Sequence, residues 1–115
     1  MTIQFNNPHI QFAIDAVRQA SLLIRHIQVE LAPQAAIKAD RSPVTVADFS
    51  AQALVGRLLA QRLPGESLVG EESSGMLTDP ANCRITEQTL RYVSKVVPGA
   101  ATDQVLEWID RGNAE

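Results

Sequence analysis

The sequence predicts a mostly helical chain with one short strand. Apolar residues recur at steps of three and four in two long stretches, residues 8–32 and 45–62, and this spacing is typical of amphipathic helices. A short, partly β-branched segment at residues 67–70 predicts the strand. The 115 residues suggest one domain at most, residues 1–115, and a hydrophobic content of 45% is enough for a core.

The charge and cysteine content exclude several classes of partner. The net charge is −3 and no run of basic residues occurs, so binding to nucleic acid is not predicted. No apolar run approaches the roughly 20 residues of a membrane span, and the N-terminus lacks the pattern of a secretory signal. Cys83 is alone and cannot form an internal disulfide, which fits a reducing compartment. We therefore predict a cytoplasmic protein without nucleic-acid or membrane partners.

The first predicted helix has clear start and stop signals. Asn7 is a good N-cap, and Pro8 fits the first helical position, where its missing N–H is not needed. Pro33 is predicted to stop the helix. His26 lies beside the apolar stripe and is interpreted as a surface or boundary residue rather than a metal ligand. The stripe consists of Ile10, Ala13, Ile14, Val17, Ala20, Ile24 and Ile27.

Residues 35–44 predict an extended connection. Its charged residues Lys38, Asp40 and Arg41 could form a hairpin near an active site or an ordinary solvated loop. The second helix is predicted to open at Thr45 and to end at the Pro-Gly turn of residues 64–65.

Asp48 allows two interpretations from the pattern alone. The spacing Thr45-x-x-Asp48 resembles a capping box, in which both side chains satisfy free backbone N–H groups at the helix start. Alternatively, Asp48 is a functional acid.

The second helix has an apolar stripe that can pack against the first helix as an antiparallel pair; its members are Ala51, Leu54, Val55, Leu58 and Leu59.

Two acids follow the predicted strand directly. Glu71 and Glu72 come after Gly70, whose missing side chain would let the backbone approach a bound ion or phosphate. They could also be two solvated acids at the start of a loop.

Residues 73–84 predict a loop by composition. Cys83 lies within it and has no histidine close in sequence that could activate a nucleophilic thiol.

Two shorter helices are predicted near the end of the sequence. Thr86 can cap the first, and the Pro-Gly pair at residues 98–99 breaks it. Thr102 or Asp103 can cap the second, and Gly112 is a fitting stop. Their predicted apolar faces consist of Leu90, Val93 and Val97, and of Val105, Leu106 and Ile109.

Three acids therefore stand at the two ends of one helix–turn–strand unit. Asp48 lies near the start of the helix, and Glu71 and Glu72 lie at the end of the strand, so the chain path can bring the three together. Hard divalent cations such as Mg²⁺ prefer oxygen ligands of this kind and usually share them with substrate phosphate. The sequence thus predicts a Mg²⁺ site at Asp48, Glu71 and Glu72.

Two motifs resemble those of a known enzyme family. Residues 42–48 (Ser-Pro-Val-Thr-Val-Ala-Asp) and 69–73 (Val-Gly-Glu-Glu-Ser) are similar to the first two motifs of the Mg²⁺-dependent, lithium-sensitive phosphatases related to inositol monophosphatase. Residues 16–23, 38–48 and 108–113 favour the 3'(2'),5'-bisphosphate nucleotidase branch. The resemblance covers nearly the whole chain but only the N-terminal part of the family, whose later Asp-Pro-Ile-Asp-Gly-Thr and Trp-Asp motifs do not occur in the 115 residues.

The resemblance implies a fold and a set of roles. The fold would be the N-terminal portion of the layered sugar-phosphatase architecture, of α+β class. Glu71 would be a direct ligand of Mg²⁺, and Glu72 would lie beside it, either in the outer shell of the metal or supporting the loop. Asp48 would hold and help to activate a metal-bound water. Residues that contact the substrate are not identified by these motifs.

The implied reaction removes the 3'-phosphate of 3'-phosphoadenosine 5'-phosphate, a step in sulfur metabolism, and yields AMP and phosphate. Because most metal ligands of the family lie in the missing motifs, the 115-residue chain is expected to be inactive alone. One alternative is a fragment of an inositol phosphate phosphatase. Another is a non-enzymatic helical module left by truncation, which self-associates or binds a separate C-terminal portion.

Overall fold

In the computed structural model, which describes residues 7–38 and 42–113, the chain is mostly helical, as predicted. Within these ranges, none of the helices is both long and apolar enough to cross a membrane. The elements are α1 (Pro8–Lys38), α2 (Ser42–Arg62), α3 (Gly75–Thr78), the 3-10 helix η1 (Pro80–Asn82), α4 (Cys83–Val96) and α5 (Thr102–Asp110).

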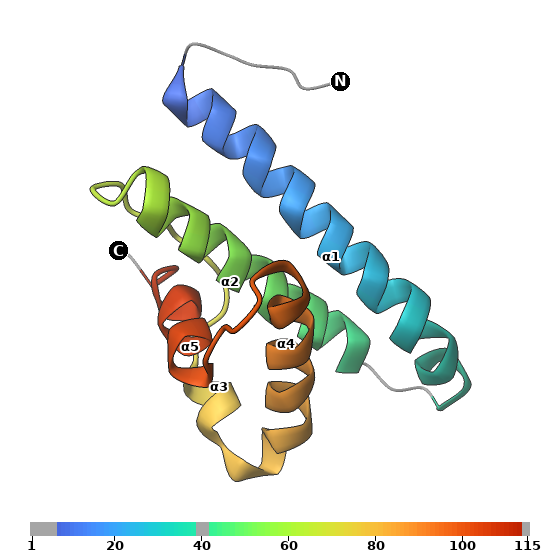
Figure 1. Cartoon of the computed structure of the whole chain (residues 1–115). Coiled ribbons are helices and arrows are strands. Elements are labelled where there is room, and N and C mark those ends of the chain that lie inside the picture. The colour runs from blue at the N-terminus through green and yellow to red at the C-terminus, as the bar shows by residue number, and fades with distance from the viewer. Residues whose placement is uncertain (1–6, 39–41, 114–115) are drawn as a thin grey trace.

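Helix α2 is the central element. It runs antiparallel to α1 along one side, and it contacts α4 and α5 along the other (Figure 1), which confirms the predicted helix pair. The core lies between these four helices because each contributes apolar side chains to the same buried cluster. Its most enclosed members include Leu23 and Ile27 of α1, Val46, Phe49 and Leu54 of α2, Tyr92 and Val93 of α4, and Val105 and Ile109 of α5.

Two predicted boundaries at the α1–α2 connection are wrong. Helix α1 continues past Pro33 to Lys38, so residues 35–38 are not extended. A proline removes its own N–H and crowds one carbonyl in the preceding turn, but it leaves the following residues able to donate hydrogen bonds. The predicted charged hairpin falls largely on Asp40 and Arg41, which lie outside the described residues.

Helix α2 begins at Ser42, three residues before the predicted start. Pro43 does not prevent this because a proline in the first turn replaces an N–H that has no partner there. Thr45 and Asp48 consequently lie inside the helix, so the capping-box interpretation of Asp48 is wrong. The predicted end of the helix is confirmed, since α2 stops at Arg62, just before the turn at residues 64–65.

The strand predicted at residues 67–70 is not confirmed. Val69 forms only an isolated antiparallel bridge with Asn113. The loop predicted for residues 73–84 contains two short helices, and α4 begins at Cys83 rather than near Thr86. Thr86 therefore lies inside α4 and does not cap it, and its hydroxyl donates to Leu77 O (2.7 Å) and Asn82 O (3.2 Å).

The C-terminal end of α4 and the start of α5 lie close to the predicted positions. Helix α4 ends at Val96, and Gly99 adopts a φ of 80°, a conformation that side-chain-bearing residues rarely take. Helix α5 starts at Thr102, with Ala101 rather than Thr102 or Asp103 at the cap position. The side chain of Gln104 reaches back to accept from Ala101 N–H (3.0 Å), which satisfies one free donor of the helix start.

The crossing of α2 and α5 depends on a glycine. A Cβ atom built at Gly56 would lie 2.0 Å from the carbonyl oxygen of Trp108, so the two backbones are closer than any side chain at position 56 would allow. Trp108 itself is partly buried against the core, and the Arg57 guanidinium lies 5.9 Å from the centre of its ring. The partial burial of Trp108 agrees with a packing role for α5, which the apolar spacing of this helix predicts.

A buried tyrosine joins α4 to α1. The Tyr92 hydroxyl donates to Glu30 Oε2 (2.5 Å), and Lys95 Nζ donates to the other oxygen of the same carboxylate (2.9 Å). Burial, followed by the hydrogen bond to Glu30, raises the pKa of Tyr92 to about 12. The hydrogen bonds from Tyr92 and then Lys95 lower the pKa of Glu30.

Tyr92 is the single tyrosine of the sequence, so its ionisation can be followed by tyrosinate absorbance. We expect a midpoint near pH 12 in the folded chain and about 10 in denaturant. Since folding raises this pKa, the stabilisation is complete below about pH 10 and is lost as the pH rises through 12. Glu30→Gln should lower the folded-state midpoint because it removes a negative charge. An unchanged midpoint near 10 in the folded wild-type chain would contradict the contact.

Candidate functional site

The three acids predicted as site residues line one open hollow. Asp48 lies on α2, and Glu71 and Glu72 lie on the segment that follows Val69. Gln52 of α2 completes one wall of the hollow, next to Ala51. The helix–turn–return path therefore brings the acids together, as the sequence spacing indicated.

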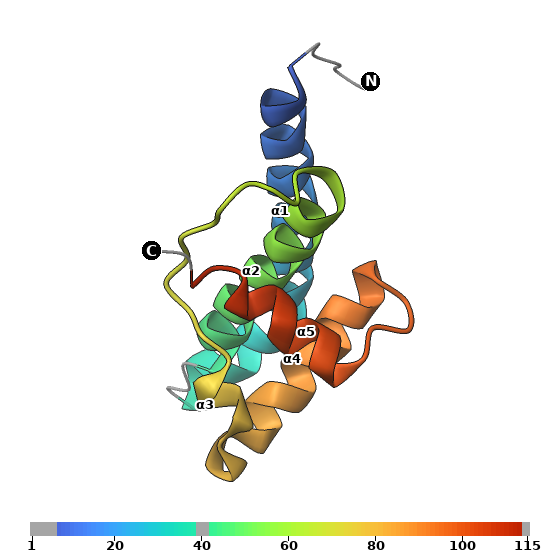
Figure 2. The ribbon, with the colours of Figure 1, turned by 90° about the vertical axis from the view of Figure 1, so that its left-hand side faces the viewer.

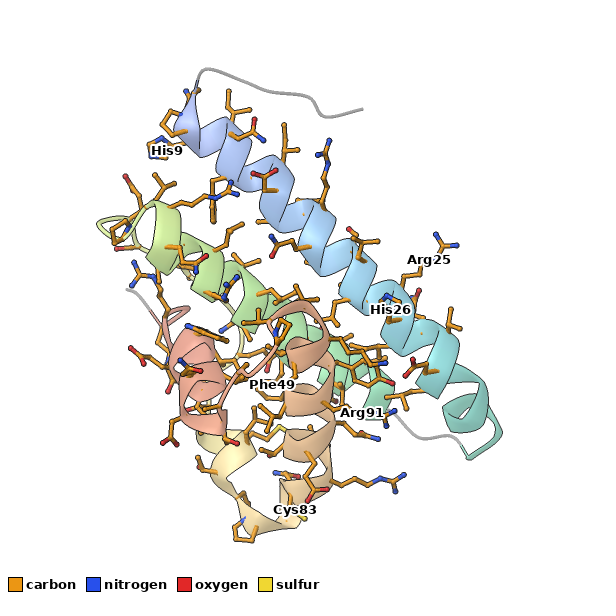
Figure 3. All side chains as sticks on the ribbon, in the orientation of Figure 1. His9, Arg25, His26, Phe49, Cys83 and Arg91 are labelled. Carbon is orange, nitrogen blue, oxygen red and sulfur yellow. The ribbon has the colours of Figure 1, made fainter. Side chains whose placement is uncertain are left out.

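Helix geometry explains why Asp48 faces this hollow. Val46, Phe49 and Ala53 are buried in the core, and Phe49 points into the middle of the helices (Figure 3). Residues four apart on a helix are neighbours on one face, so Asp48 and Gln52 lie together on the side of α2 that meets the Glu71–Glu72 segment. Asp48 remains exposed there.

The Glu71–Glu72 segment is held at both ends by the C-terminal end of α5. Figure 2 shows the connection between α2 and α3 passing beside that end of the chain. Gly70 N–H donates to Gly112 O at 2.7 Å. Two residues after Glu72, both the N–H (2.8 Å) and the hydroxyl (2.5 Å) of Ser74 donate to the Asp110 carboxylate.

Gln52 joins the same segment to α2. Its Oε1 accepts from Glu72 N–H at 3.0 Å, and its Nε2 donates to Glu72 O and to Ile109 O, both at 2.7 Å. A Cβ atom at Gly70 would lie 2.4 Å from Gln52 Oε1. The glycine before the two acids is thus required for the close approach of the Gln52 amide.

The electrostatics of the hollow are those of three acids placed close together. Partial burial raises the pKa of the Glu72 carboxyl, and the negative charges of Asp48 and then Glu71 raise it further. A cation bound in the hollow would relieve this repulsion.

The sequence of this chain is similar to those of several curated proteins. No protein-family model matches the chain. A "3'(2'),5'-bisphosphate nucleotidase" of Schizosaccharomyces pombe is 43% identical over 116 residues, which cover 90% of this chain and 33% of the relative. A "3'(2'),5'-bisphosphate nucleotidase 2" of Candida albicans is 31% identical over 121 residues, which cover 92% of this chain and 33% of the relative. The chain belongs to the 3'(2'),5'-bisphosphate nucleotidase family.

A plant relative extends the similarity beyond fungi. The "Probable 3'(2'),5'-bisphosphate nucleotidase 3" of Arabidopsis thaliana is 39% identical over 89 residues, which cover 68% of this chain. The chain spans about a third of the length of the two fungal nucleotidases.

The hollow of this nucleotidase-family chain supplies suitable donors for Mg²⁺ but does not close around an ion. Carboxylate oxygens are the ligands that Mg²⁺ prefers, and the negative charges of Asp48 and Glu71 add to the effect of burial in raising the pKa of Glu72. Within residues 7–38 and 42–113, however, no group of three or more histidine, cysteine, aspartate or glutamate side chains is arranged to hold a metal ion. The ligand roles of Asp48, Glu71 and Glu72 therefore stay predictions.

Other candidate groups lie away from the hollow. His9 and His26 are on α1, and Cys83 is exposed at the start of α4, at the end of the molecule opposite His9 (Figure 3). His9 Nε2 pairs with Glu66 Oε1 at 3.2 Å, and His26 is a surface residue, as predicted. Neither histidine is placed to activate the thiol.

Two residues of the site were missed by the sequence interpretation. Gln52 could have been found because it lies four residues after Asp48 and shares its helix face. Asp110 lies in residues 108–113, which entered only as part of a resemblance, and no spacing connects it to Ser74. Its position beside the Glu71–Glu72 segment depends on the packing of α5 against α2.

Proposed function

We propose that this chain forms part of a Mg²⁺-dependent phosphatase that removes the 3'-phosphate of 3'-phosphoadenosine 5'-phosphate to give AMP and phosphate. The observation that carries the proposal is the hollow in which Asp48, Glu71 and Glu72 meet, in a chain of the bisphosphate nucleotidase family. On this proposal the whole enzyme is lithium-sensitive and acts in the cytoplasm, in sulfur metabolism.

Phosphate monoesters are hydrolysed extremely slowly without a catalyst. Bound Mg²⁺ would neutralise ester charge and make a water molecule more acidic. In the proposed enzyme, the Glu71 carboxylate would hold the cation directly, and Glu72 would lie in the outer shell or support the loop. Asp48 would hold the attacking water and help to activate it. The anchoring of the Glu71–Glu72 segment to α2 and α5 supports this assignment because catalytic groups need fixed mutual positions.

The isolated 115-residue chain should release no phosphate from 3'-phosphoadenosine 5'-phosphate with Mg²⁺ present, since its described carboxylates do not close around an ion. A chimaera in which it replaces the aligned stretch of the S. pombe relative should restore Mg²⁺-dependent release, measured as inorganic phosphate. The relative with that stretch deleted is the control. A folded but inactive chimaera would contradict the proposal, and turnover by the isolated chain would contradict the need for further ligands.

Fewer observations support the alternative of a non-enzymatic interaction module. Leu22 and Val29 are exposed on α1 at 62% and 69% and line a surface hollow with Arg25, His26 and Glu30. Self-association through such a surface stays a prediction, and the acid cluster makes the enzyme fragment the better-supported proposal.

A further inference from the structure

The amide of Gln52 makes a paired contact with one residue of the acidic segment. Oε1 accepts from Glu72 N–H (3.0 Å) while Nε2 donates to Glu72 O (2.7 Å), so both backbone groups of Glu72 are bound by one planar group. The same Nε2 also donates to Ile109 O near the end of α5 (2.7 Å). One side chain therefore fixes the acidic segment to α2 and to α5 together.

The space around this amide is shaped by two glycines. A Cβ atom at Gly70 would lie 2.4 Å from Gln52 Oε1, and one at Gly112 would lie 2.5 Å from Gln52 Nε2. These glycines are joined to each other by the hydrogen bond from Gly70 N–H to Gly112 O. Any larger residue at either position would displace the amide. The observed position of the Gln52 amide therefore requires glycine at both residue 70 and residue 112.

The contact determines where two acids stand relative to a third. Asp48 and Gln52 lie four residues apart on α2, so Asp48 moves with the helix that carries the amide. Three like charges around one hollow favour separation of the Glu71–Glu72 segment from α2. The uncharged amide opposes that separation without adding further negative charge.

We propose that Gln52 is a positioning residue that holds Glu71 and Glu72 beside α2, at the same hollow as Asp48, from where these acids can contribute to cation binding. This inference rests on the proposed Mg²⁺-dependent function. Gln52 does not touch the reacting atoms in this assignment. It acts through the backbone of Glu72, and its contribution should be seen in the cation dependence of the reaction rather than in substrate binding.

Gln52→Met tests the inference because it keeps the length of the side chain and removes all three hydrogen bonds. In the isolated chain, exchange of the Glu72 amide hydrogen should become roughly tenfold faster, as measured by NMR. The amides of Phe49 and Ala53, in the core-facing turns of α2, should exchange at the wild-type rate. Gln61→Met, at an exposed glutamine of the same helix, is the matched control and should change neither.

The S. pombe chimaera provides the functional readout. Gln52→Met should raise the Mg²⁺ concentration for half-maximal activity by roughly tenfold, as expected for a residue that orients ligands. The KM for 3'-phosphoadenosine 5'-phosphate at saturating Mg²⁺ should stay at the wild-type value. A purely structural loss would instead lower the amount of active enzyme without changing the Mg²⁺ dependence.

The outcomes separate the two proposals. An inactive wild-type chimaera overturns the proposed function, whereas an active one with unchanged Mg²⁺ dependence in Gln52→Met overturns the positioning role. An unchanged Glu72 exchange rate in the isolated variant overturns the positioning role whatever the chimaera does. If Gln52→Met does not fold, Gln52→Glu replaces it. That variant cannot donate to the two carbonyls and places a carboxylate oxygen against them, so it should lower the protection of the Glu72 amide; a wild-type exchange rate in Gln52→Glu overturns the inference.

Discussion

Glu71→Gln in the S. pombe chimaera should lower Mg²⁺-dependent release of phosphate from 3'-phosphoadenosine 5'-phosphate by on the order of 100- to 1,000-fold. Glutamine preserves the shape of the side chain but removes the negative charge that holds a hard cation. The exposed position of Glu71 beside Asp48 and Glu72 means that the substitution should not disturb the core. Initial rates at saturating Mg²⁺, together with circular dichroism of both proteins, measure the effect.

Glu66→Gln is the matched control for this experiment. Glu66 is also an exposed glutamate of the connection between α2 and α3, but it faces His9 rather than the acidic hollow. We expect its rate to stay within about twofold of wild type, since a single exposed ion pair contributes little. Equal rates for the Glu71→Gln and wild-type chimaeras would remove Glu71 from the proposed site.

Gly56→Ala should lower the free energy of unfolding by about 2 kcal/mol. The new methyl group would lie 2.0 Å from Trp108 O, and neither backbone can yield without moving α5 away from α2. Overpacking of this kind costs about 3 kcal/mol, and the better helix propensity of alanine offsets about 1 kcal/mol of it. The melting temperature, measured by circular dichroism, should fall by roughly 10 °C.

Gly65→Ala separates this steric effect from the general effect of adding a methyl group. A Cβ atom at Gly65 meets nothing within 4 Å, and Gly65 does not have a positive φ. Its unfolding free energy should therefore stay within about 0.5 kcal/mol of wild type. A Gly56→Ala chain as stable as wild type would show that α2 and α5 pack at a greater distance.

The long helices were predictable because their apolar spacing extends over several turns. The start of α1 at Pro8 was predicted correctly, whereas the end of α1 and the start of α2 were not, because Pro43 fits both an extended connection and a first helical turn. The strand at residues 67–70 was predicted from β-branched composition, yet a strand needs a partner. In the described chain, Val69 finds only the single bridge to Asn113.

The acids of the site could be predicted from the sequence, but the residues that hold them in place could not. Asp48, Glu71 and Glu72 are acids that can be recognised in the sequence. The chain between Asp48 and Glu71 is short enough to fold back and bring them together. Gln52 and Asp110 act through hydrogen bonds to backbone groups on another segment, and such partners are determined by tertiary packing. The position of an aspartate or a glutamine in a helical pattern does not indicate which backbone groups of another segment it will bind.

The anchoring of the acidic segment has a consequence for the order in which the chain folds. The pairing of α1 with α2 joins neighbours in sequence, so it closes a short loop at low entropic cost. The contacts of Ser74 with Asp110 and of Gln52 with Ile109 join residues 36 and 57 positions apart. The anchors of the acidic segment at Asp110 and Gly112 form only when α5 has docked, so we expect the hollow to form late in folding and to be lost early on unfolding.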